Sequence, residues 1–302
     1  MDRVTLAPDI FHLQSGSNMG LLIQEGQALL IDTGLDGDAG RRALRIIEDL
    51  PARLAAIVVT HAHADHFGGA RFLQQRLGVP LYAPDLEAAM MEHPIIEPLY
   101  LFGGAAPIEE LRHKFTLAEP CTVNQTIAPG QVEIGPFELD VIPLPGHALN
   151  QVGVAVGEPG RRVLFCADAI FPKETIEKHK VLFCVDLDET LETIEDLPSR
   201  PYDCFAPGHG LAYDAGEAVQ AICRANRDRL QDVREEVYNA LEGPKETSGL
   251  VRHIAKQLGL RITGPAAYFL TRTTVLAALT SLQRAGGATA VMDDNIVIWE
   301  RG

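Results

Sequence analysis

The chain has 302 residues, 46% of them hydrophobic, and a formal net charge of −15 with its histidines neutral. This length suits one large domain, or one domain with a smaller one. The excess of acidic residues argues against nucleic acid or an anionic membrane as a general partner. No apolar run approaches the ~18 residues that cross a bilayer. With no secretory segment at the start and no C-x-x-C pair among five cysteines, we expect reduced thiols and a cytoplasmic protein.

The first part of the chain predicts three strands, at 9–14, 19–24 and 28–31. The third strand ends in Asp32-Thr33-Gly34, which is ordinary turn chemistry unless the aspartate has a further role. A helix is expected at 38–49, because its apolar residues share one face and a proline follows at position 51.

The most informative stretch follows the apolar run 55–59 and places three histidines and an aspartate within six residues. Two glycines then lead into a helical stretch at 70–77. Open α/β sheets bind ligands at the carboxyl ends of their strands, and imidazole with carboxylate suits zinc, iron or manganese. Because these side chains cannot all reach one ion, we expect His61 and His63 at one metal and Asp65 and His66 at a second. A solvated polar loop is the alternative, but it leaves the spacing unexplained.

The pattern His61-x-His63-x-Asp65-His66 resembles the signature of the metallo-β-lactamase superfamily. The resemblance covers roughly residues 8–212. It implies an α/β fold, a four-layer αββα sandwich, with the metals at one edge of the two sheets. It also implies further metal ligands later in the chain.

Three later strands end in residues that can bind a metal. The strand at 137–142 leads to His147, the strand at 162–167 to Asp168, and the strand at 202–206 to His209. Each alone would be read as a core or turn residue, but their order matches the later motifs of the superfamily. The resemblance implies that His147 completes the first metal site, that Asp168 bridges the two ions and that His209 completes the second site. It also implies that Asp32 lies beside the metals and orients their ligands.

The chain departs from the resembled family at a few positions. Residues 148–151 are Ala-Leu-Asn-Gln, where a small hydroxyl residue and a glycine are usual, and Ala167 replaces the usual glycine before Asp168. A bridging aspartate does not fit the β-lactamases that use a cysteine ligand. His63 stands where flavodiiron proteins have glutamate, which favours the zinc-type hydrolase branch.

Two segments supply candidate substrate contacts. Residues 92–104 mix proline, glycine and large apolar side chains, which predicts a lid or pocket wall. A packed surface excursion or a subunit contact is the alternative. The candidate substrate-binding residues are Tyr100 and Phe102 in this segment, Asn150 near the first metal, and His179 and Lys180, which could also belong to a solvated face.

The remaining residues, 215–302, form a second predicted domain after a catalytic domain at 1–214. A long helix at 215–242, helices at 249–258 and 271–285, and a hairpin at 288–299 resemble a winged helix. RNA binding would follow from that resemblance. The net charge of this region, about +1, instead favours a cap that closes the pocket or forms a homodimer.

These features predict a dinuclear-metal hydrolase with two divalent ions, preferably zinc, with iron or manganese as alternatives. A hydroxide that bridges the ions would attack a small ester, thioester or lactone, and Asp65 would take or relay the proton. Two other activities share the motif. One is a persulfide dioxygenase with a single iron, and the other is an RNA-processing endonuclease that uses the C-terminal region. No partner other than a small-molecule substrate is required.

Overall fold

The computed structural model describes residues 1–302 and contains two sheets packed face to face. The first sheet has seven strands in chain order: β1 (Asp2–Ala7), β2 (Ile10–Gln14), β3 (Met19–Gln24), β4 (Gln27–Ile31), β5 (Arg53–Val58), β6 (Leu81–Pro84) and β7 (Gln125–Ile127). The pairs β4–β5, β5–β6 and β6–β7 are parallel, and the earlier pairs are antiparallel.

The second sheet has six strands in the spatial order β13-β12-β11-β10-β9-β8. Its strands are β8 (Gly130–Ile134), β9 (Phe137–Pro143), β10 (Val152–Val156), β11 (Val163–Ala167), β12 (Cys204–Pro207) and β13 (Tyr213–Asp214). Only the pair β11–β12 is parallel. Both β11 and β12 therefore end at the same edge, which bears on the placement of Asp168 and His209.

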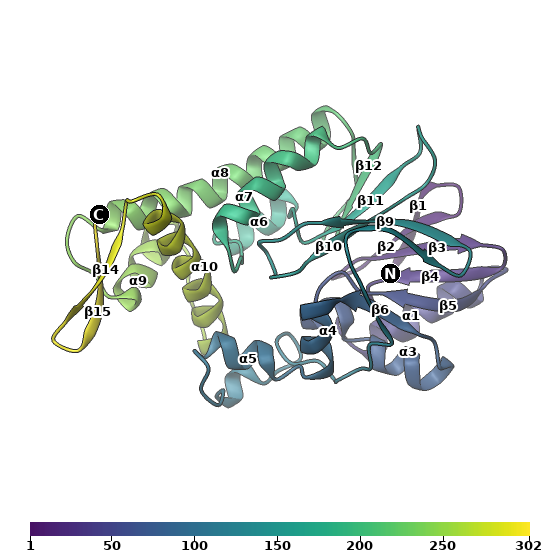
Figure 1. Ribbon diagram of the computed structural model, residues 1–302, viewed down its shortest axis with the longest axis horizontal. Coiled ribbons are helices and arrows are strands. Elements are labelled where there is room, and N and C mark those ends of the chain that lie inside the picture. Colours follow the sequence, from purple (N-terminus) through teal and green to yellow (C-terminus); the bar gives the residue numbers. More distant parts are fainter.

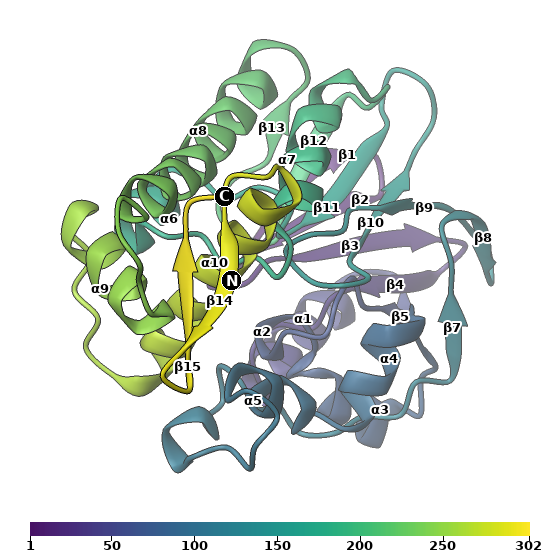
Figure 2. The same cartoon turned by 60° about the vertical axis from the view of Figure 1, so that its left-hand side comes forward.

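Helices cover the outer face of each sheet (Figure 1). The first sheet carries α1 (Gly37–Glu48), α2 (Ala64–Phe67), α3 (Ala70–Leu77) and α4 (Asp85–Glu92). The second carries α6 (Lys173–His179), α7 (Leu187–Asp196), α8 (Glu217–Ala240) and α10 (Pro265–Arg284). The short helix α5 (Ile96–Leu101) lies against the end of α10, and α9 (Thr247–Gln257) lies between α8 and the hairpin of β14 (Thr289–Asp293) and β15 (Ile296–Glu300) (Figure 2).

Three hydrophobic clusters fill the three interfaces of this arrangement. Side chains alternate between the two faces of each strand. Leu30 accordingly packs under α1 and α3, whereas its neighbours Leu29 and Ile31 lie between the two sheets. In the second sheet, Phe165 faces the first sheet and Leu164 faces the outer helices. The predicted four-layer αββα sandwich is confirmed.

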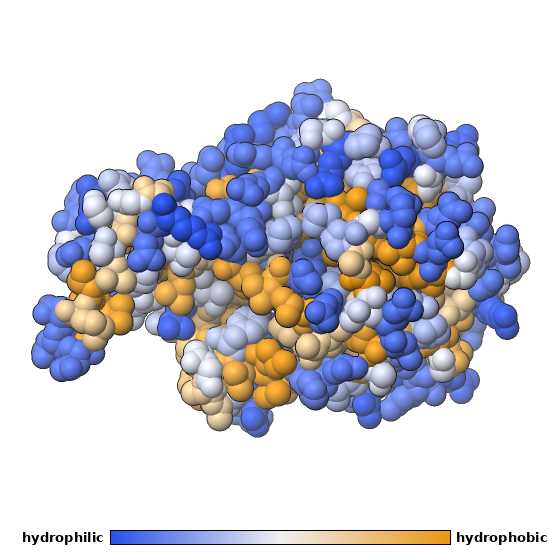
Figure 3. Space-filling model, in the orientation of Figure 1, coloured by the Kyte–Doolittle hydropathy of each residue, from blue (hydrophilic) through white to orange (hydrophobic).

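The C-terminal helices share the outer core of the second sheet. One cluster of 33 buried residues extends from Ile142 to Ala288 and includes Phe205 of β12, Val219 of α8 and Leu279 of α10. The hairpin is more peripheral, with Met292 68% and Val297 49% exposed. Figure 3 shows apolar residues over this hairpin, and further apolar patches between hydrophilic areas of the same face. The boundary at residue 214 and the winged-helix resemblance stay predictions.

The clearest differences from the sequence prediction concern β1, α5 and α10. β1 was not predicted, because its first four residues face solvent and show no alternation. The segment 92–104, predicted as irregular, contains α5, whose following residue Phe102 packs edge to face on Phe269 of α10 with 5.2 Å between ring centroids. α10 begins at Pro265, six residues earlier than predicted, since proline is favoured in the first turn of a helix. No helix has both the length and the apolar character that a membrane crossing requires.

Candidate metal centre

Four connections place seven histidine and aspartate side chains at one edge of the sandwich. The loop after β5 carries His61 and His63 and leads into α2, which holds Asp65 and His66. The connection between β9 and β10 carries His147, and Asp168 and His209 follow the ends of β11 and β12. The structure therefore brings together all seven residues that the sequence singled out.

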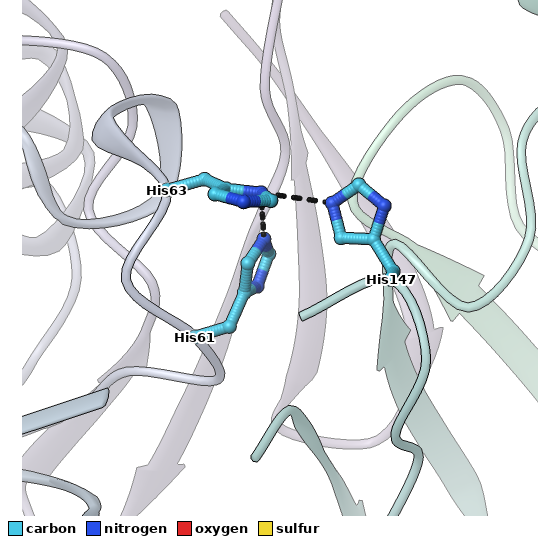
Figure 4. A group of neighbouring side chains, drawn as sticks. All are labelled: His61, His63 and His147. Atoms are coloured by element: carbon cyan, nitrogen blue, oxygen red, sulfur yellow. Dashed lines mark hydrogen bonds between the residues drawn. The ribbon is translucent and has the colours of Figure 1, made fainter. Parts of the chain in front are cut away.

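The first group consists of three imidazoles whose ring nitrogens converge (Figure 4). His63 Nδ1 lies 3.1 Å from His61 Nε2 and 2.8 Å from His147 Nε2. Burial lowers the pKa of all three histidines, that of His63 to about 3. Neutral imidazoles present free lone pairs, and this is the form that binds a metal.

A second group lies beside the first and consists of Asp65, His66 and His209. His209 Nε2 is 3.4 Å from Asp65 Oδ2, and His66 Nε2 is 3.9 Å from the same oxygen. Although burial opposes it, the carboxylates of Asp168 and Asp65 raise the pKa of His209 to about 10. This group thus combines two imidazoles with a strongly acidic environment that favours a cation.

Asp168 contacts both groups. Its Oδ1 lies 3.3 Å from His66 Nε2, and its Oδ2 lies 3.4 Å from His209 Nε2 and 3.5 Å from His147 Nε2. His66 Nε2 and Asp168 Oδ1 are buried and make no hydrogen bond. Buried polar atoms without a partner are costly, so the donor set fits a bound cation that they would both face.

The second ring nitrogen of four histidines is fixed by a neighbour outside the centre. His66 Nδ1 pairs with Asp32 Oδ2 at 2.8 Å, and His61 Nδ1 lies 3.1 Å from the Thr60 hydroxyl. Backbone carbonyl oxygens accept from Nδ1 of the other two, with Phe183 serving His147 at 3.0 Å and Gly16 serving His209 at 2.8 Å. Such contacts select the tautomer that turns Nε2 toward a metal.

Asp32 is buried, and its backbone has a positive φ of 61°. Besides His66, its carboxylate accepts from the backbone N–H and the hydroxyl of Thr60. Asp32 therefore connects the end of β4 to the loop that holds His61. This contact supports the predicted orienting role rather than simple turn chemistry.

Two close approaches explain residues beside the ligands. A side chain on Gly208 would overlap Asp168 Oδ1 and the ring of His66, so only glycine fits there. Ala167, which stands where the resembled family has glycine, keeps the positive φ of 47° that glycine would adopt freely. A residue with a Cβ rarely adopts this conformation, so the backbone before Asp168 is strained at Ala167.

Two further residues of the centre were not predicted. Glu87 of α4 is fully buried, and its carboxylate accepts from the backbone N–H of Ala62 at 2.8 Å and of Asn150 at 2.9 Å. It joins the loop of His61 and His63 to the segment after His147. Ser17 donates its hydroxyl to Asp65 Oδ2 at 2.7 Å. Both contacts bridge segments that are distant in sequence, and no local pattern marks them.

The predicted substrate contacts lie in different places. A cavity of about 1000 Å³ opens onto the centre, and His179 is among its lining residues. Tyr100, Phe102, Asn150 and Lys180 are not among them. Phe102 packs on α10 and the Asn150 backbone binds Glu87, so their substrate-binding roles stay predictions. Phe171 and Phe183, which flank His147, line the cavity instead.

Solved structures share this fold over the whole chain. A beta-lactamase domain protein from Burkholderia ambifaria matches with a TM-score of 0.75 and 21% identity, covering 100% of this chain and 94% of that one. A metallo-beta-lactamase family protein from Thermus thermophilus matches with the same TM-score and identity, covering 99% of this chain and 100% of that one. At this identity the likeness shows the fold alone.

Curated relatives match over shorter stretches. The hydroxyacylglutathione hydrolase GloC of Haemophilus influenzae is 28% identical over 148 residues, 49% of this chain and 63% of its own length. An exodeoxyribonuclease of Streptococcus pneumoniae, WalJ, is 37% identical over 93 residues, 31% of this chain and 35% of its own. The chain thus spans less than two thirds of these relatives. The family profile described as the metallo-beta-lactamase superfamily matches residues 13–209, and the chain belongs to that superfamily.

Proposed function

We propose that this protein is a dinuclear-metal hydrolase that cleaves a small ester, thioester or lactone. The observation that carries the proposal is the contact of Asp168 with both groups of ligands. His61, His63 and His147 would hold one ion, and Asp65, His66 and His209 would hold the other, with Asp168 between them. Nitrogen and carboxylate donors suit zinc, with iron or manganese as alternatives.

Two ions held by these residues would supply an activated water and would stabilise the charge that develops on the substrate. The exposure of the surrounding side chains indicates from which side a substrate could reach that water. Asp168 and His66 are almost fully enclosed, whereas the side chains of Asp65 and His209 are 25% and 21% exposed. Asp65 is therefore the carboxylate of the centre that can exchange a proton with the cavity, and Ser17 holds it in place.

The relatives support hydrolysis but differ in substrate. One group is named for hydroxyacylglutathione, and another is named as nucleases. The net charge of −15 favours a small substrate over a polyanion.

A screen of metal-loaded protein against esters, thioesters and lactones tests the proposal. We expect turnover that His63→Ala abolishes, together with loss of bound metal. Oxygen uptake with a persulfide, or cleavage of RNA or DNA without any acyl hydrolysis, would replace the proposal by one of the alternatives.

A further inference from the structure

The cavity beside the metal centre is larger than a small ester requires. Its volume of about 1000 Å³ is at the upper end of the range for small-molecule sites. His63, Asp65, His147, Asp168 and His209 line one part of it. The rest of the cavity is thus continuous with the place where hydrolysis would occur.

Polar and charged residues make up much of the remaining wall, and its apolar part comes mainly from two parts of the chain. α10 and the loop before it contribute Leu260, Ile262, Ala267 and Leu270. The segments after β4, β11 and α6 contribute Leu35, Phe171, Val181, Leu182 and Phe183. Apolar side chains at a cavity wall favour an apolar ligand, because burying each methylene group is favourable by ~0.8 kcal/mol.

The charged residues of the cavity do not form a site for a polyanion. Apart from the centre and Glu97, three acidic and three basic side chains line it: Asp36, Asp38, Glu174, Arg42, Lys114 and Lys178. Lys114 Nζ is already paired with Asp36 Oδ2 at 3.1 Å. No excess of positive charge remains to bind a phosphate backbone.

The wall formed by α10 is fixed to the metal centre. Thr274 donates its hydroxyl to the carbonyl oxygen of Leu182 at 3.1 Å and accepts from the Cys184 N–H at 3.4 Å. Between these two residues lies Phe183, whose carbonyl oxygen binds His147 Nδ1. The position of α10 is therefore coupled to that of a ligand, as a substrate wall requires.

We propose that α10 and the loop before it form an acyl-binding pocket, and that the substrate is an ester or thioester of an apolar acyl chain longer than acetyl. This rests on the proposed hydrolase function. Water oxygen bonds to the acyl carbon, the bond from that carbon to oxygen or sulfur breaks, and the alcohol or thiol leaves with a proton. The products are a carboxylate and the free alcohol or thiol, and the second proton of the water is released to solvent.

The experiment measures kcat/KM for p-nitrophenyl esters from acetyl to decanoyl with the metal-loaded full chain. We expect a rise of at least about tenfold from acetyl to octanoyl. Leu270→Trp, which fills the pocket, should move the preferred chain length down by several carbons. Leu276→Trp is the matched control, since Leu276 is a half-buried residue of the same helix outside the cavity lining. The ratio of the kcat/KM values for two chain lengths does not depend on the fraction of folded protein. Ile262→Trp is a second variant that fills the cavity.

A binding measurement separates this proposal from the hydrolase function. Calorimetry with decanoate and acetate should show decanoate binding to the wild type and weakened binding to Leu270→Trp. If decanoate binds in this way but no ester is cleaved, the pocket stands and the hydrolase function fails. If esters are cleaved equally at all chain lengths, or if neither tryptophan variant changes length preference or decanoate binding, the acyl pocket is wrong.

Discussion

Glu87 connects the loop that carries His61 and His63 to the segment after His147. Removing its carboxylate in Glu87→Ala leaves the buried N–H of Ala62 and the partly buried N–H of Asn150 without their acceptor, and frees both segments that carry candidate ligands. We expect metal affinity to fall by ~10–100-fold and stability by ~2 kcal/mol or more, measured by metal-competition titration and denaturant unfolding. Glu92→Ala is the control, because Glu92 lies on the same helix but binds Val123, away from the centre. Equal metal affinities for both variants would contradict the role.

Asp32 offers a second test of the role of a single residue. In Asp32→Asn, an amide N–H would point at His66 Nδ1, where the carboxylate accepts a hydrogen bond in the wild type. Two hydrogens cannot face each other there, so His66 would lose the tautomer that directs Nε2 toward the centre. We expect the affinity for one of the two ions to fall by ~10–100-fold while the other stays bound. Asp36→Asn should bind both ions normally, since asparagine caps α1 as well as aspartate does. Unchanged binding in Asp32→Asn would show that the contact is only structural.

The seven candidate ligands could be brought together from the sequence, because they lie in one contiguous motif or after strand ends, where chain order is enough to find them. Glu87 and Ser17 could not. Glu87 reaches its partners through backbone N–H groups that lie 25 and 63 residues away in the sequence. Such contacts are set by tertiary packing and leave no periodic signal.

At the scale of elements, the turn after the histidine motif depends on Gly68. A Cβ at this position would overlap the backbone oxygens of Leu35 and Ala64, where α2 approaches the connection after β4. We expect Gly68→Ala to lower the free energy of unfolding by at least ~2 kcal/mol, measured by denaturant titration. Gly249→Ala in α9 meets nothing within 4 Å and should be neutral or stabilising by up to ~1 kcal/mol. A wild-type stability for Gly68→Ala would show that the approach can relax.

Most elements could be predicted because most buried strands are apolar runs and outer helices such as α1 and α7 have one apolar face. The failures share a physical cause. β1 pairs through its backbone while its side chains face solvent. α5 is held by contacts such as that between Phe102 and Phe269 rather than by its own sequence. Tertiary context decides such short elements.

For the molecule as a whole, the shared outer core predicts that the C-terminal region is required for folding. Deleting residues 215–302 would expose apolar side chains of the second sheet and α7, such as Leu164, Ile194 and Phe205. We expect the 1–214 fragment to aggregate or to lose cooperative thermal unfolding. Deleting only 289–302, the more exposed hairpin, should keep a cooperative transition. A 1–214 fragment that unfolds cooperatively and binds metal would show an independent domain.

The measurement that tests the central claim most directly is the number and identity of metal ions bound per chain, compared between the wild type and Asp168→Ala. The proposed centre predicts about two zinc or manganese ions in the wild type. In the variant it predicts loss of the paired site with the fold retained, because the Asp168 carboxylate contacts both groups. One iron per chain in the wild type, or two ions still tightly bound in the variant, would contradict the dinuclear hydrolase.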